Sequence, residues 1–271
     1  MKNLIYQYWD GKLLPGHKAG RTAMQSYADR IGVEYLFEDN PRWQTALGQY
    51  SPHYGSFKFV YDGSFDIYDN ILYADIDIFP VDGLTENIFD GFTAELGICT
   101  EPMQPKFRSS SITPGGITSR NDEVWAKMIR DVYGKDMPRD SDGLLKVYNS
   151  GLVLWSRLGI MKGRKNLPVF KGYIQHCRES GLPSFYTADQ NYIHAAKDIA
   201  GFDWIELDNN WNSYIHYHGE GDPRPVNDSR TENTKFVHVQ LRAADHFDKE
   251  TLHTIVNNPV EVWNGKLPKI G

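Results

Sequence analysis

The chain has 271 residues, of which 40% are hydrophobic and 24% are charged, and its formal net charge at pH 7 is −6. A chain of this length can bury the core of one globular domain, which we expect to span residues 1–271. The acidic balance argues against broad nucleic-acid binding, which usually requires a basic face.

The first segments predict a β-α-β unit. Residues 3–9 are apolar and rich in strand-forming residues, residues 18–31 carry apolar side chains at helical spacing, and residues 33–37 predict a second strand. This opening is typical of a Rossmann-like α/β fold. The glycine fingerprint of a dinucleotide site does not follow the first strand.

Further strands and helices are predicted along the rest of the chain. The strands are residues 70–76, 92–100, 149–156 and 235–241, and the helices are residues 121–133, 169–178, 188–197 and 249–256. The helix at 121–133 would be capped by Asn121 and would bury Val124, Met128 and Val132. Residues 101–120 and 134–147 predict loops. The fold class is therefore mixed α/β.

Two features bear on the cellular location of the protein. Cys99 and Cys177 are too few for a disulfide framework and suit a reducing compartment. The sequence has no apolar stretch of signal-peptide length at its start, and no run approaches the ~18 apolar residues of a membrane span. We expect a cytoplasmic protein with no transmembrane segment.

The strongest chemical signal is a pair of carboxylates, Asp75 and Asp77, directly after an apolar strand. Their spacing would place both side chains on one face if the strand continued through them. Because burial of two like charges is costly, a hard divalent cation that also binds phosphate oxygens is an attractive partner. A solvated strand end is the alternative.

Several histidines could add to such a site. His238 lies in the apolar strand at 235–241, and imidazole with two carboxylates suits Mn²⁺ better than Mg²⁺. A buried core histidine is the alternative, and His246 is a competing ligand. His216 and His218 alternate along one segment, but no neighbouring zinc ligands support them, so we expect a polar loop there.

Four segments in this order resemble the retaining glycosyltransferase family 8, whose members have the GT-A fold. The segments are Asn70–Asp77 with its Asp-x-Asp motif, Tyr148–Leu154 with Asn-Ser-Gly, Ala188–Ile193 with Asp-Gln, and His238 as a late metal ligand. The resemblance spans about residues 1–247 at the level of motifs. The opening Tyr6–Trp9 is similar to the first strand of related toxin-like sugar transferases. The family's His-Phe-x-Gly signature near the end is absent here.

The resemblance implies a GT-A type Rossmann-like α/β/α sandwich with a mostly parallel central sheet. It implies metal-dependent transfer of a hexose from a nucleotide sugar, with UDP as the expected nucleotide, to a glycan, lipid or protein with retention of configuration. Asp75, Asp77 and His238 would bind Mn²⁺, or alternatively Mg²⁺. Residues of about 1–100 would bind the donor, and residues of about 101–271 would complete the acceptor side.

The resemblance also implies roles for other residues. The donor contacts would be Gln7, Tyr8 and Trp9 at the base, Lys58 as a point charge, Asp75 at the ribose, and Asn149 and Ser150 at the sugar. Asp189 and Gln190 would lie near the anomeric carbon, as a nucleophile or as groups that stabilise positive charge. Structural alternatives are sheet packing for the aromatic residues, an exposed helix position for Lys58, and helix capping for Asp189.

Three other functions remain open. An inverting glycosyltransferase would need a carboxylate base, for which Asp140 or Asp142 is available. A metal-dependent nucleotidyltransferase would need a phosphate loop near the first strand, which Gly11-Lys12 together with Gly16-His17-Lys18 match only faintly. A non-catalytic carbohydrate-binding protein is the third, although it has no need for an acidic pair at a strand end.

Overall fold

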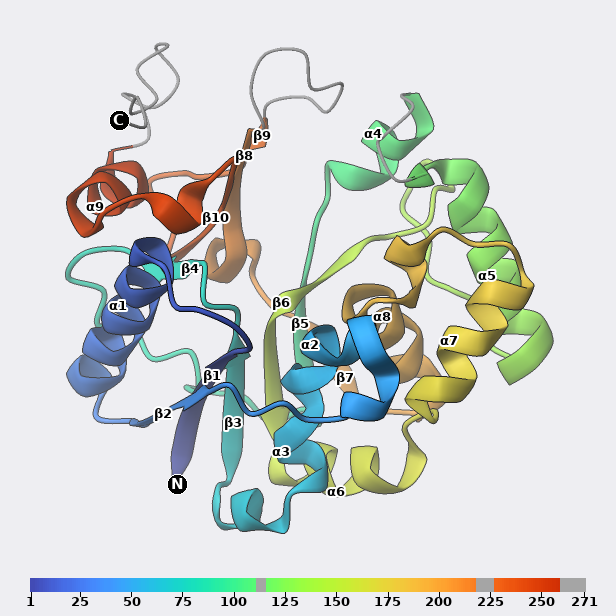
Figure 1. Ribbon diagram of the computed structural model, residues 1–271, viewed down its shortest axis with the longest axis horizontal. Helices are drawn as coiled ribbons and strands as arrows, with labels where there is room; N and C mark the ends of the chain where they lie inside the picture. Colours follow the sequence, from blue (N-terminus) through green and yellow to red (C-terminus); the bar gives the residue numbers. More distant parts are fainter. Residues whose placement is uncertain (111–115, 218–226, 259–271) are drawn as a thin grey trace.

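Two β-sheets organise the residues described by the computed structural model, which are residues 1–110, 116–217 and 227–258 (Figure 1). The larger sheet has the strand order β2-β1-β3-β6-β5-β7, and the smaller has the order β4-β10-β8-β9. Helices flank the larger sheet on both sides (Figure 1). Among the described residues, no helix combines the length and the apolar character needed to cross a membrane.

The larger sheet is mostly parallel, as predicted. Its strands are β1 (Asn3–Trp9), β2 (Glu34–Asp39), β3 (Asn70–Ala74), β5 (Leu96–Thr100), β6 (Tyr148–Ser156) and β7 (Trp204–Glu206). Strands β2, β1 and β3 are parallel, β7 is parallel to β5, and β6 runs antiparallel to both β3 and β5. The C-terminal end of β3 and the N-terminal end of β6 therefore lie side by side at the same end of the sheet.

Alternating side chains of the strands fill the layers on both faces of this sheet. Tyr6 and Tyr73 belong to one buried cluster, whereas their neighbours Ile5 and Leu72 belong to another. The helices are α1 (Pro15–Ile31), α2 (Ser51–Tyr54), α3 (Lys58–Tyr61), α4 (Gln104–Ser110), α5 (Ser119–Tyr133), α6 (Arg157–Asn166), α7 (Phe170–Glu179), α8 (Asp189–Ile199) and α9 (Lys249–Asn257). This arrangement confirms the predicted α/β sandwich.

The smaller sheet brings a late segment of the chain beside the end of β3. Its strands are β4 (Ile78–Pro80), β8 (Ser213–Tyr217), β9 (Asn227–Asp228) and β10 (Phe236–Leu241). Strand β10 pairs antiparallel with β4, with His238 opposite Ile78, and parallel with β8. Because Ile78 directly follows Asp77, this pairing places His238 next to the predicted carboxylate pair.

Helix α5 differs from its prediction in two details. Its N-cap is Thr118, whose hydroxyl accepts the backbone N–H of Asn121 at 3.2 Å, so Asn121 is not the cap. Of the predicted apolar face, Met128 is buried, but Val124 and Val132 are 36% and 43% exposed, and the fully buried Ile129 was not part of that face. The helix turns its larger apolar side chains to the core instead. Helix α4 (Gln104–Ser110) lies within residues 101–120, for which the sequence predicted a loop, so that prediction is wrong for this part of the segment.

Candidate active site

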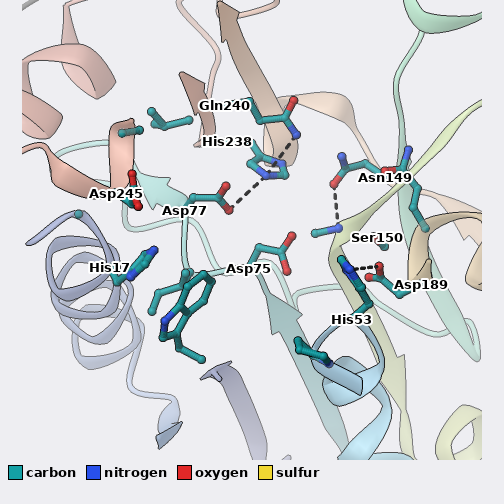
Figure 2. A pocket seen from close by; sticks show the side chains of 18 of the residues that line it. His17, His53, Asp75, Asp77, Asn149, Ser150, Asp189, His238, Gln240 and Asp245 are labelled. Carbon is teal, nitrogen blue, oxygen red and sulfur yellow. Dashed lines mark hydrogen bonds and ion pairs between the residues drawn. The ribbon is translucent and has the colours of Figure 1, made fainter. Parts of the chain in front are cut away.

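A cavity of about 770 Å³ opens where β3 ends and β6 begins (Figure 2). The residues predicted for the site that line it are Tyr8, Trp9, Asp75, Asp77, Asn149, Ser150, Asp189, Gln190 and His238. They come from β1, the β3–β4 connection, β6, α8 and β10. The topology therefore gathers residues from distant parts of the sequence into one cavity.

Asp75, Asp77 and His238 form a compact group in this cavity. Each offers a ligand atom, and these atoms lie within 4.8 Å of one another. His238 Nε2 lies 3.2 Å from Asp77 Oδ1 (Figure 2). Strand β3 ends before Asp75, and the backbone turns through Asp77 so that Ile78 N–H donates to the carbonyl oxygen of Asp75 at 3.1 Å. A turn, and not a continuous strand, therefore brings the two carboxylates together.

A glycine permits the close packing of this group. The backbone N–H of Asp75 donates to the carbonyl oxygen of Gly151 at 2.7 Å. A Cβ atom at Gly151 would lie 2.7 Å from Asp75 Oδ2 and 2.8 Å from His238 Cε1, closer than real Cβ contacts. A side chain there would therefore displace both candidate ligands.

The electrostatics of the group favour a positive charge between the carboxylates. Burial, reinforced by the neighbouring Asp77, raises the pKa of Asp75 to about 6. Burial alone would raise the pKa of Asp77, but His238 outweighs it and lowers that pKa. Burial would likewise lower the pKa of His238, yet Asp77 raises it to about 9. A proton on the imidazole provides this charge in the metal-free protein.

The residues fit a divalent cation in chemistry and in spacing. Ligand bonds of about 2.1 Å in an octahedral shell place donor atoms roughly 3 to 4 Å apart, close to the spacing observed here. A mixed carboxylate and imidazole set suits Mn²⁺. His238 Nδ1 is buried with no hydrogen-bond partner among the described residues, while Nε2 faces Asp77. Nε2 is therefore the nitrogen placed to bind a cation.

Aromatic rings form one wall of the cavity beside this group. The rings of Trp9 and His17 have centroids 3.9 Å apart, and both residues line the cavity. Tyr8 also lines it, and its ring stacks on that of Tyr73 at 5.9 Å between centroids. Tyr8 thus also packs against the sheet.

Two of the predicted site residues do not line the cavity. Gln7 is fully buried, and its Nε2 donates to the carbonyl oxygen of Asp75 at 2.9 Å. Lys58 forms an ion pair with Glu38. Gln7 therefore touches the site through the backbone of a candidate ligand, and Lys58 is engaged elsewhere.

Asp189 lies on the opposite side of Asp75 from His17 (Figure 2). It is the first residue of α8, next to the N-cap Ala188, where a carboxylate interacts favourably with the helix dipole. Burial raises its pKa to about 7, and the charge of Asp75 contributes. Its Oδ1 lies 3.9 Å from His53 Nδ1.

Other polar residues outside the predicted glycosyltransferase site also line the cavity, among them Asp10, His17, His53, Gln240 and Asp245. Gln240 Nε2 lies 3.4 Å from His238 Nε2, and their spacing of two along one strand could have indicated this. His216 also lines the cavity, from strand β8 and not from the expected loop, whereas His218 lies outside the described residues.

The two carboxylates considered as a base for inversion do not line the cavity. Asp140 instead closes a turn, since its Oδ1 accepts the backbone N–H groups of Asp142 and Leu144, both at 2.9 Å.

No protein-family model and no curated protein matches this sequence. Among solved structures, the chain is similar to a glycosyltransferase involved in the glycosylation of the major capsid of PBCV-1, with 12% identity and a TM-score of 0.45 over 88% of this chain and 92% of that one. It is also similar to A197 from STIV, with 12% identity and a TM-score of 0.38 over 86% of this chain and 96% of that one.

Proposed function

We propose that this protein is a metal-dependent glycosyltransferase that transfers a hexose from a nucleotide sugar, with UDP as the first nucleotide to test, and retains the configuration at the anomeric carbon. The observation that carries the proposal is the group of Asp75, Asp77 and His238 inside a cavity large enough for such a donor. A GT-A type arrangement is consistent with the mostly parallel sheet and its antiparallel strand β6.

We assign the parts of a nucleotide sugar to separate groups in the cavity. Trp9 offers an aromatic face for the base beside the carboxylate pair. A cation held by Asp75, Asp77 and His238 would offset the charge on the diphosphate as it leaves. The sugar would then extend towards Asn149, Ser150 and Asp189, which lie across Asp75 from His17 (Figure 2).

Asp189 and Gln190 are the residues that we place at the reacting carbon. Burial and Asp75 together raise the pKa of Asp189 to about 7. A cation bound to Asp75 would offset the negative charge that helps to raise the pKa of Asp189. Asp189 would then ionise more readily, and the ionised carboxylate is the form that attacks or stabilises a positive sugar ring. The Gln190 amide can present its carbonyl oxygen to the same developing charge.

The test is nucleotide release from UDP-, GDP- and CMP-sugars, with and without Mn²⁺. We expect one donor to be hydrolysed slowly in a Mn²⁺-dependent reaction, and Asp77→Asn to lower the rate by roughly a hundredfold or more. Asp66→Asn is the matched control, because this exposed carboxylate pairs with Arg164 outside the cavity. Turnover that needs neither Mn²⁺ nor Asp77 would contradict the proposal.

A further inference from the structure

Glu101 is a buried carboxylate immediately behind the cavity. It follows β5, is 6% exposed, and is not among the residues that line the cavity. Its backbone N–H donates to the carbonyl oxygen of Val147 at 2.8 Å, which fixes it beside the start of β6. A carboxylate in such a place needs hydrogen-bond donors around it.

Two side-chain amides that line the cavity supply those donors. Asn149 Nδ2 donates to Glu101 Oε1 at 2.6 Å, and Gln190 Nε2 donates to the same oxygen at 3.2 Å. A carboxylate oxygen accepts hydrogen bonds, so each amide turns its NH₂ group towards Oε1 of Glu101. The oxygen of each amide is consequently directed elsewhere.

This constraint extends through Asn149 to the backbone beside the metal-binding group. Asn149 Oδ1 accepts the Gly151 N–H at 2.8 Å and Asn212 Nδ2 at 2.9 Å. Asn212 Oδ1 is left buried without a hydrogen-bond partner among the described residues. Glu101 and the backbone N–H of Gly151 therefore hold the two ends of the Asn149 amide in place.

We infer that Glu101 is a positioning residue, which sets the orientation of the Gln190 and Asn149 amides and leaves the Gln190 carbonyl oxygen for the substrate. Gln190 reaches the cavity while its nitrogen is bound behind the cavity wall. In the proposed reaction, on which this consequence rests, that oxygen faces the positive charge that develops on the sugar.

The orientation can be measured without any turnover. We expect the Gln190 side-chain amide, identified by its absence in Gln190→Ala, to exchange its hydrogens slowly in the protein labelled at glutamine nitrogen. Glu101→Gln should accelerate this exchange by roughly fivefold or more, because an amide at 101 can present either end. A Gln190 amide that exchanges at the same rate in both proteins would overturn the inference.

Kinetics separate a positioning role from a general structural one. Glu101→Gln should lower kcat by about tenfold and change KM for the donor and Mn²⁺ affinity by less than about twofold. In the Gln190→Ala background the same change should have a much smaller effect on kcat, because the two residues act as a unit. Equal, independent losses in the two backgrounds would overturn the inference.

The outcomes also distinguish this inference from the proposed function. If the wild-type protein releases no nucleotide from any donor while Glu101 still protects the Gln190 amide, the proposed function fails and the positioning role stands. If turnover is Mn²⁺-dependent but Glu101→Gln alters neither the exchange nor kcat, the proposed function stands and the positioning role fails.

Discussion

Gly151 lies against two of the candidate metal ligands, Asp75 and His238. Even a methyl group at this position should therefore disturb metal binding. We predict that Gly151→Ala weakens Mn²⁺ binding by roughly tenfold or more, because its Cβ would overlap Asp75 Oδ2 and His238 Cε1. Calorimetric titration with Mn²⁺ measures this directly.

A matched glycine in helix α7 provides the control. A Cβ at Gly172 meets no atom within 4 Å, and alanine favours a helix over glycine by about 1 kcal/mol. Gly172→Ala should therefore leave Mn²⁺ affinity unchanged and raise the Tm slightly. If both variants bind Mn²⁺ like the wild type, the close packing at Gly151 has no role in the site.

The raised pKa of Asp189 predicts how the metal-free protein responds to pH. The folded state binds this proton more tightly than the unfolded chain does, because burial raises the pKa from 3.8 to about 7. Its contribution to stability is therefore lost as pH rises from about 4 to about 7. Asp189→Asn should make the metal-free protein more stable at pH 8, by on the order of 2 kcal/mol.

Thermal unfolding at pH 4 and at pH 8 in the presence of a chelator checks this prediction. The gain in Tm from Asp189→Asn should appear at pH 8 and be nearly absent at pH 4. Asp66→Asn should show no such gain, because Arg164 lowers the pKa of Asp66. A loss of stability for Asp189→Asn at pH 8 would contradict the assigned environment.

At the residue scale, the sequence identified those site residues that stand beside or within an apolar strand. The Asp75 and Asp77 pair follows an apolar strand, and His238 lies inside one. A polar residue stands out in such a setting, so these three could be chosen from the sequence alone. Glu101 and His53 have no such local pattern. Their positions depend on contacts with residues far away in the chain, such as Gln190 and Asp189, which the sequence alone does not specify.

At the element scale, the apolar periodicity of helix α5 predicted the helix but not all of the residues that it buries. Ile129 is fully buried whereas Val124 is 36% exposed, although the predicted apolar face contained Val124 and not Ile129. We predict that Ile129→Ala lowers the free energy of unfolding by about 2–5 kcal/mol and that Val124→Ala lowers it by less than about 1 kcal/mol. Urea unfolding measures both, and equal effects would contradict the observed orientation of the helix.

The long strands were predictable and the short ones were not. Strands β1, β3 and β6 span five or more residues and are rich in apolar side chains, which distinguishes them in the sequence. Strands β4 and β7 have three residues each and owe their existence to pairing with β10 and β5. A run of three residues carries no periodicity, so tertiary pairing decides its conformation.

At the scale of the whole molecule, the site depends on the junction between the two sheets. The larger sheet supplies the end of β3 and the start of β6, and the smaller sheet supplies His238 by pairing β10 with β4. Distant parts of one chain thus contribute the candidate ligands. The central claim is that these three side chains together bind a divalent cation.

Calorimetric titration of Mn²⁺ into the protein with UDP present tests that claim most directly, using the wild type, Asp77→Asn and His238→Ala. The account predicts one Mn²⁺ per chain for the wild type and affinities roughly a hundredfold weaker or worse for both variants. Wild-type affinity in both variants, or no Mn²⁺ binding by the wild type with UDP present, would contradict it.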